Sequence, residues 1–298
     1  MAVIPSGVEN GAAWEGATWT GRPKAERVGS ERIKSLDVSE GTRDVSTSLD
    51  TTTRLLASLH VYHDDGRHSG AMNMALDEAL LEHATVPSIR FYQWRAPALS
   101  FGYFGEFGEV AIHERERDLV RRWTGGGIVF HGDDLTYSIV IPVRDSVFAE
   151  SSMNIYKKVH RALADALNGL HESAELGACN RDRSRRGALQ VALRRTGDRR
   201  SLESAIMDRG SNCFANPVHA DVMLNGQKIA GAAQRRTRRG LLQQGSIQGV
   251  DLENDLAEQF AHALSVNCSE RQMSREVLDR ARELAQQKYG ADFWLRMR

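Results

Sequence analysis

Three short segments of this sequence carry residue types that can do chemistry. The first is Arg121-Arg122-Trp123-Thr124-Gly125-Gly126-Gly127-Ile128-Val129-Phe130-His131, in which two arginines precede three successive glycines. Glycines between strands expose backbone N–H groups and let a ligand approach the main chain, and arginine binds a phosphate or carboxylate bidentately. The same pattern also describes a glycine-rich hairpin with solvated arginines, which is the more common result of a glycine run.

The second segment is Asp221-Val222-Met223-Leu224-Asn225-Gly226-Gln227-Lys228-Ile229-Ala230-Gly231. Asn-Gly between two short apolar runs predicts a β-hairpin with a type I′ turn. Lys228 then lies in the second strand, beside the small residues 230–233, where it could project into a cleft that a ligand enters. The alternative is an exposed lysine that discourages pairing at a sheet edge.

The third segment is Ser211-Asn212-Cys213-Phe214-Ala215-Asn216-Pro217, which is typical of a loop. A loop cysteine near a cation can act as a thiolate nucleophile, whereas a plainer interpretation makes Cys213 a small buried hydrophobic residue. Cys179 and Cys268 have no comparable neighbours. Three cysteines without a close pair predict neither a disulfide framework nor a zinc site, so we expect no metal.

Helices and strands are expected on both sides of these segments. Residues 69–81 carry apolar side chains at helical spacing, with Ser69 available as N-cap; further helices are expected over 155–170 and twice after residue 252. Strands are expected over 59–62, 88–94, 99–103, 119–122, 128–131, 135–141, 222–224, 227–230 and 241–247. Because a strand and not a helix follows the three glycines, the nucleotide-binding Rossmann and Walker arrangements are excluded. The pattern predicts an α+β fold with mixed α and β elements around one core.

Composition limits the partners of the chain. Lys+Arg and Asp+Glu number 39 each, so no net charge points to nucleic acid or to a membrane surface. No segment approaches the roughly 20 apolar residues of a membrane span, and no secretory signal begins the chain, so we expect a cytoplasmic protein. Residues 1–56 should be a disordered N-terminal extension, residues 57–298 the folded domain, and the eight arginines of 181–200 a solvated insert.

Several motifs follow one another in a fixed order. They are Met72-Asn73-Met74-Ala75-Leu76-Asp77-Glu78, Ile89-Arg90-Phe91-Tyr92-Gln93-Trp94, the segment from Arg121 to His131, Leu135-Thr136-Tyr137-Ser138, Lys228-Ile229-Ala230-Gly231 with Gln234-Arg235-Arg236, and Gln244-Gly245-Ser246. This order resembles the lipoate–protein ligase and octanoyltransferase family over residues 59–298. The resemblance implies the biotin/lipoate protein ligase catalytic-domain fold, a mixed sheet flanked by helices.

The resemblance also implies roles for individual residues. Lys228 matches the central catalytic lysine of the family, and Cys213-Phe214 with Pro217 resembles the nucleophile segment of the cysteine-type octanoyltransferases. The family lines its acyl and nucleotide pocket with the arginine–glycine segment. The substrate-binding residues that this implies are Arg90, Arg122, Gly125, Gly126, Gly127, Ile128, Val129, Phe130, His131 and Gly231.

Members of this family perform one of two reactions. Octanoyltransferases move octanoate from acyl carrier protein through a cysteine thioester to a lysine of a lipoyl-domain protein, such as the glycine-cleavage H protein or an E2 subunit of a 2-oxoacid dehydrogenase, without a cofactor. Ligases use ATP and Mg to make lipoyl-AMP first. Cys213 favours the transferase, while the uninterrupted Gly125-Gly126-Gly127 resembles the ligase form, so the acyl donor stays open. A third hypothesis is an inactive module that only binds lipoyl domains, and the presence of Lys228 argues against it.

Overall fold

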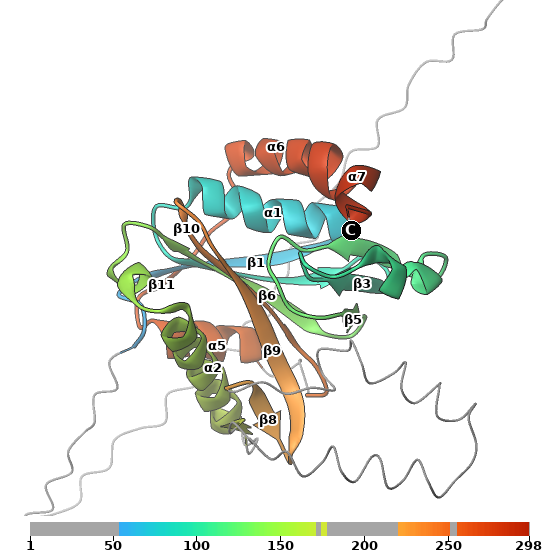
Figure 1. Cartoon of the computed structure of the whole chain (residues 1–298). Helices are drawn as coiled ribbons and strands as arrows, with labels where there is room; N and C mark the ends of the chain where they lie inside the picture. Colours follow the sequence, from blue (N-terminus) through green and yellow to red (C-terminus); the bar gives the residue numbers. More distant parts are fainter. Residues whose placement is uncertain (1–53, 171–173, 178–219, 251–254, 298) are drawn as a thin grey trace, which may run out of the picture. The chain divides into compact units, whose positions relative to one another are not determined.

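An eight-stranded mixed sheet forms the centre of the described part of this chain (Figure 1). The computed structural model describes residues 54–170, 174–177, 220–250 and 255–297. The strands lie in the order β11-β1-β2-β6-β10-β9-β8-β7; β11, β1 and β2 are parallel and the other neighbouring pairs antiparallel. Their bounds are β1 Leu59–His68, β2 Ser88–Trp94, β6 Leu135–Pro142, β7 Ala174–Leu176, β8 Val222–Leu224, β9 Gln227–Arg236, β10 Gly240–Ile247 and β11 Cys268–Glu270.

A second, three-stranded sheet carries the arginine–glycine segment. Its strands lie in the order β4-β3-β5, with β3 parallel to β4 and antiparallel to β5. Their bounds are β3 Ala98–Phe101, β4 Asp118–Arg121 and β5 Val129–His131. The glycine run connects β4 to β5, so its backbone lies at one end of this small sheet.

Helices cover both faces of the large sheet (Figure 1). One face carries α1, α6 and α7, and the other carries α2 and α5. Their bounds are α1 Gly70–His83, α2 Ser152–Gly169, α5 Leu256–Leu264, α6 Arg275–Leu284 and α7 Asp292–Leu295. The hydroxyl of Ser69 accepts a hydrogen bond from the Met72 backbone N–H, which confirms the predicted cap. None of the helices within the described ranges is long and apolar enough to cross a membrane.

The two faces of the large sheet differ in polarity. Side chains on a strand alternate between faces, and Phe91 of β2 and Ile139 of β6 pack into the apolar core beneath α2 and α5. The residue before each of these, Arg90 in β2 and Ser138 in β6, points to α1. Both side chains bind the carboxylate of Asp77 there. Buried polar side chains therefore lie between α1 and the sheet, and this face is the candidate location of a binding or catalytic site.

The α+β class predicted from the sequence is confirmed, and most predicted elements form. The hairpin turn has φ of 50° at Asn225 and 76° at Gly226, as a type I′ turn requires. Strand β11, between the last helices, was not predicted, because its three residues lack apolar alternation and form a strand by pairing with β1. The core also begins before residue 57, since Leu56 is buried. Residues 1–53 and the arginine-rich insert at 181–200 lie outside the described residues.

Gly245 provides a test of this packing. It pairs with Tyr137 across β10 and β6, and a Cβ at residue 245 would lie 2.3 Å from the ring Cζ of the fully buried Tyr137. Gly245→Ala should therefore lower the free energy of unfolding by about 1–3 kcal/mol, measured by urea denaturation. Gly169→Ala is the control, because a Cβ there meets no atom within 4 Å; equal stability of the two variants would contradict the tight packing.

Candidate active site

A cavity on the α1 side of the large sheet is lined by residues from α1 and from both sheets. The empty space among these atoms, together with the part that opens to solvent, is about 440 Å³. Its apolar walls include Met74, Trp94, Val129, Ala232 and Ala233. Its polar side chains are Ser100, Arg122, His131, Thr136, Gln244 and Ser246.

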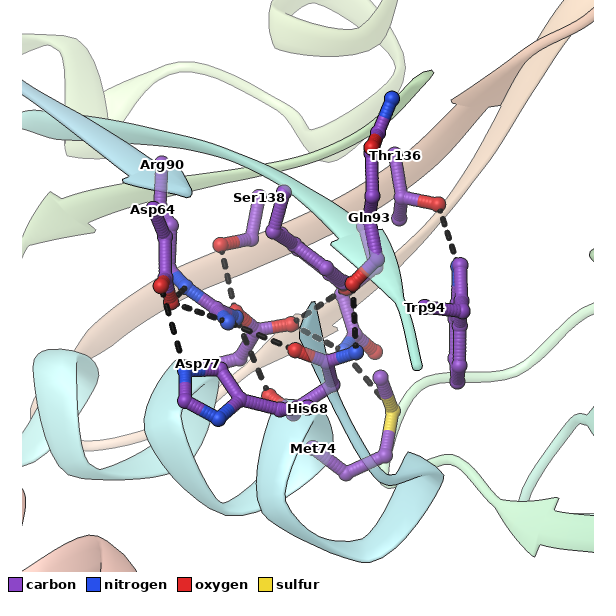
Figure 2. Close-up of polar contacts among 12 residues, drawn as sticks. Asp64, His68, Met74, Asp77, Arg90, Gln93, Trp94, Thr136 and Ser138 are labelled. Carbon is purple, nitrogen blue, oxygen red and sulfur yellow. Dashed lines mark hydrogen bonds and ion pairs between the residues drawn. The ribbon is translucent and has the colours of Figure 1, made fainter. Parts of the chain in front are cut away.

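The carboxylate of Asp77 organises one wall of the cavity (Figure 2). Asp77 is fully buried and accepts four hydrogen bonds. Its Oδ1 accepts from Arg90 Nη1 at 2.8 Å and Ser138 Oγ at 2.7 Å, and its Oδ2 accepts from Tyr92 OH at 3.1 Å and Gln244 Nε2 at 2.7 Å. Burial first, and the charge of Asp77 second, raise the pKa of Tyr92 well above its ordinary value, so the phenol keeps its proton and donates.

Arg90, a predicted substrate-binding residue, lies behind this wall. Its guanidinium donates to Asp64 Oδ2 at 2.7 and 2.9 Å, to Asp77, and to Asn73 Oδ1 at 2.7 Å (Figure 2). The side chain has no exposed surface and is not among the residues lining the cavity. Arg90 binds Asp77, and Asp77 in turn binds Tyr92 and Gln244, which line the cavity.

The two arginines before the glycine run have different roles. Arg122 lines the cavity and donates through Nη2 to the carbonyls of Gly125 at 3.1 Å and Gly127 at 2.7 Å. The glycine loop therefore folds back around its own arginine, with φ of 87° at Gly126. Arg121 is fully buried and donates instead to the backbone carbonyls of Trp294 and Leu295, both at 2.9 Å. Arg121 therefore holds the C-terminal helix α7 and is not among the residues that line the cavity.

Alternation along β5 decides which residues after the glycines reach the cavity. Val129 and His131 line it, whereas Ile128 and Phe130 pack into a small apolar cluster of the second sheet. Of the predicted substrate-binding residues, the structure brings together at the cavity Arg122, Gly126, Val129, His131 and Gly231. Those that do not line it are Arg90, Gly125, Gly127, Ile128 and Phe130.

His131 is the centre of a second polar network. Its Nδ1 lies 2.7 Å from Asp134 Oδ2, and its Nε2 lies 2.7 Å from Ser100 Oγ. Burial lowers the pKa of His131, so the imidazole is neutral at neutral pH; the Nδ1 proton points to the carboxylate. Asp134 also accepts from Thr136 Oγ1 at 2.9 Å and from Ser246 Oγ at 2.7 Å. Four polar side chains of the cavity wall are thus connected through one aspartate.

Lys228 lies directly behind the cavity wall at Gly231. Its Nζ is 2.8 Å from Asp221 Oδ2, and the exposed fractions of the two side chains are 2% and 0%. A Cβ at Gly231 would lie 2.7 Å from this Nζ, so the ammonium packs against the glycine that lines the cavity. The alternative of an exposed edge lysine is therefore wrong.

Helix α2 holds the segment that carries Asp221. Tyr156 OH donates to Asp221 Oδ1 at 2.5 Å and accepts from the Ala232 N–H at 3.2 Å. One helical turn later, His160 Nδ1 donates to the Ala220 carbonyl at 2.7 Å. Burial lowers the pKa of His160 to about 4, so this histidine is neutral at neutral pH. The position of Lys228 thus depends on two side chains of a helix on the opposite face of the sheet.

Sequence reasoning missed Ser100, Asp134, Tyr156 and Asp221. Asp134 offered a signal, since it follows His131 by three residues, and Asp221 directly precedes the hairpin. Ser100 and Tyr156 offered none, because their partners lie 31 and 65 residues away along the chain. Cys213 lies outside the described residues, so its role stays a prediction.

Comparison with known proteins identifies the family. A model of the lipoyl protein ligase A/B catalytic domain matches residues 69–287. The chain belongs to this family.

Relatives and solved structures of the family agree with this assignment. The chain is 33% identical over 208 residues to octanoyltransferase LipM of Bacillus cereus, covering 67% of each protein. It is 29% identical over 283 residues to octanoyltransferase LipM of Bacillus subtilis, covering 78% of this chain and 95% of the relative. The crystal structure of a lipoate-protein ligase A bound with ATP superposes with a TM-score of 0.58 at 21% identity, covering 80% of this chain and 98% of that one. This likeness shows the biotin/lipoate ligase fold predicted from the sequence.

The Lys228–Asp221 pair predicts a thermodynamic coupling. Asp221→Ala leaves a buried ammonium without this carboxylate and should cost about 3–5 kcal/mol of stability. Lys228→Met together with Asp221→Ala should cost less than Asp221→Ala alone, because the uncompensated charge is gone. Urea unfolding of the two single variants and the double variant measures the coupling; additive losses would show that the ion pair carries no interaction energy.

His160 predicts a pH dependence of stability. The unfolded chain binds a proton at this histidine near pH 6.5, whereas the folded chain binds it only near pH 4. The contribution of His160 to the free energy of unfolding is therefore complete above pH 6.5. It falls, by up to about 1.4 kcal/mol per pH unit, as the pH drops towards 4. The lowered pKa of His131 acts in the same direction. Urea unfolding from pH 7.5 to 4.5 should show this slope and His160→Gln should reduce it; a flat profile would contradict the assignment.

Proposed function

We propose that this protein transfers an octanoyl group from acyl carrier protein to a lysine of a lipoyl-domain protein, with Cys213 and Lys228 as catalytic residues. The observation that carries the proposal is a mostly apolar cavity with the buried ammonium of Lys228 behind its wall at Gly231. Membership of the lipoyl protein ligase A/B family supports lipoyl-domain proteins as acceptors. The relatives named octanoyltransferase LipM support octanoate as the transferred group.

The hydrogen bonding of the cavity walls favours a saturated acyl chain. Thr136, Ser246 and His131 all bind Asp134, and Tyr92 and Gln244 both bind Asp77. These polar side chains have protein partners already and present mainly carbon to the cavity. A ligand with its own polar groups, such as the ureido ring of biotin, would lose hydrogen bonds to water there at a cost of about 1–3 kcal/mol for each unsatisfied group. An alkyl chain loses none.

The chemistry follows from a thiol and a fixed positive charge. The Cys213 thiolate attacks the carbonyl of the octanoyl thioester, the carrier thiol leaves with a proton, and a new thioester forms on Cys213. The acceptor amine then attacks this thioester, the amide forms, and the Cys213 thiol is regenerated. Lys228, held by Asp221, stabilises the thiolate and the oxyanion of each tetrahedral intermediate. The acyl group arrives already activated, so this route uses neither ATP nor a metal ion.

The ATP-dependent alternative would require Arg122 and the glycine run to hold phosphate groups. In the structure, the Arg122 guanidinium binds the Ser100 hydroxyl and the carbonyls of Gly125 and Gly127. Bringing this guanidinium to a phosphate would break those bonds. The arrangement therefore favours the transferase.

The mass of an acceptor lipoyl domain discriminates between the two reactions. The full chain is incubated with the apo domain and either octanoyl-acyl carrier protein without ATP, or lipoic acid with ATP and magnesium. We expect the acceptor to gain one octanoyl group in the first mixture. A gain of one lipoyl group in the second mixture alone would identify a ligase and overturn the proposal.

Two substitutions test the catalytic assignment in the same assay. Cys213→Ala should abolish octanoyl transfer, and Lys228→Met should reduce its rate by about 10²–10³-fold, as loss of an oxyanion-stabilising group does. Lys158→Met is the matched control, because Lys158 is a half-exposed lysine of α2 that binds only Glu150 among the described residues; its transfer rate should be unchanged. Substantial transfer by Cys213→Ala would rule out the thioester route.

A further inference from the structure

We propose that Ser100 is a second nucleophile of this protein, activated by His131 and Asp134, and that the cavity hydrolyses medium-chain acyl thioesters and esters independently of Cys213. The proposal rests on a nucleophile bonded to a base and on a third group that orients the base. Ser100, His131 and Asp134 supply these three groups in one hydrogen-bonded chain at the cavity.

The nucleophile and its base are in hydrogen-bonding contact. Ser100 Oγ lies 2.7 Å from His131 Nε2, and both side chains line the cavity. The Ser100 oxygen accepts a hydrogen bond from Arg122 Nη1 at 2.6 Å. With one lone pair occupied by the arginine, the hydroxyl directs its single proton to the imidazole. This is the orientation required for proton transfer to a general base.

The base is fixed in one tautomer. Asp134 Oδ2 accepts the His131 Nδ1 proton at 2.7 Å, and Asp134 is itself held by Thr136, Ser246 and the backbone N–H of Gly132. Burial alone would raise the pKa of Asp134, but the hydrogen bonds that His131 and Ser246 donate to it outweigh this effect and lower the pKa, so the carboxylate is ionised. The imidazole therefore keeps its proton on Nδ1 and its lone pair on Nε2. Ser, His and Asp occupy the relative positions of a hydrolase triad, which is recognised by geometry and not by order in the sequence.

The surroundings suit an acyl substrate. The guanidinium of Arg122 donates to Ser100 Oγ at 2.6 Å and so holds a positive charge beside the attacking oxygen. The Trp94 ring stacks on His131 with centroids 4.0 Å apart and keeps the imidazole in place. Met74 and Val129 supply apolar surface for the alkyl chain in the same cavity.

The reaction balances with water as the only co-reactant. Ser100 Oγ bonds to the acyl carbon while its proton passes to His131 Nε2; the C–S bond breaks, and the leaving sulfur takes that proton. A water molecule then attacks the seryl ester and gives a proton to His131, which returns it to the Ser100 oxygen as the C–O bond breaks. The products are a fatty acid and a free thiol.

Covalent labelling tests the nucleophile directly. The full chain is treated with an octyl fluorophosphonate, which forms stable adducts with activated serines, and the modified peptide is identified by mass spectrometry. We expect one adduct on Ser100, in the unmodified protein and equally in Cys213→Ala. No adduct, or an adduct on any other residue, would overturn the proposal. This result needs no Ser100 variant and so does not depend on whether that variant folds.

Hydrolysis supplies the second measurement. Release of thiol from octanoyl-N-acetylcysteamine by Cys213→Ala, without an acceptor, should fall by about 10³-fold or more when Ser100→Ala is added, the scale of triad knockouts. Ser88→Ala is the matched control: this serine is also buried, its hydroxyl has no hydrogen-bond partner within the described residues, and it does not line the cavity. Equal hydrolysis with and without Ser100 would refute the inference. Failure of this inference is distinguishable from failure of the proposed octanoyl transfer. Transfer is measured as a mass gain of the lipoyl domain and is assigned to Cys213, whereas hydrolysis is measured without an acceptor.

Discussion

The buried carboxylate of Asp77 is the constraint on which the rest of this structure depends. An ionised group without solvent is tolerated only when it is paired and hydrogen-bonded, and Asp77 receives Arg90, Ser138, Tyr92 and Gln244 from three neighbouring strands. Helix α1 is thereby fixed against β2, β6 and β10 through polar contacts as well as apolar packing. The charge of Arg90 is balanced in turn by Asp64 (Figure 2). Removal of the Asp77 carboxylate would leave its four buried donors without this acceptor.

The same principle explains how polar side chains can surround a mostly apolar cavity. Gln244 of the wall donates to Asp77, and Ser246 and His131 donate to Asp134. Between the networks lie Gly231 and the alanines of β9, whose small size lets a ligand approach the backbone and lets the ammonium of Lys228 pack behind it. The hydrogen bonds to these two carboxylates thus hold the polar side chains of the wall in place.

Ser100 and Lys228 differ in what holds them. Ser100 is central in β3, with a base and an orienting carboxylate fixed by both sheets. Lys228, the proposed partner of Cys213, is held by Asp221 and, through Tyr156 and His160, by a helix on the opposite face of the sheet. One cavity therefore borders both arrangements, which are supported from different directions.

The sequence by itself determined the local elements and the family. The Ser69 cap, the Asn225-Gly226 turn and the spacing of apolar residues act within a few positions of the chain, and the order of the motifs identified the fold and the position of Lys228. Tertiary structure decided which side chains meet. Gln244 binds Asp77 across 167 residues of sequence. Arg121 and Arg122 are adjacent in the chain but bind different segments, the first the carbonyls of α7 and the second the glycine run. Strand β11 forms by pairing with β1. These outcomes depend on pairing and packing between distant segments, and no local propensity encodes them.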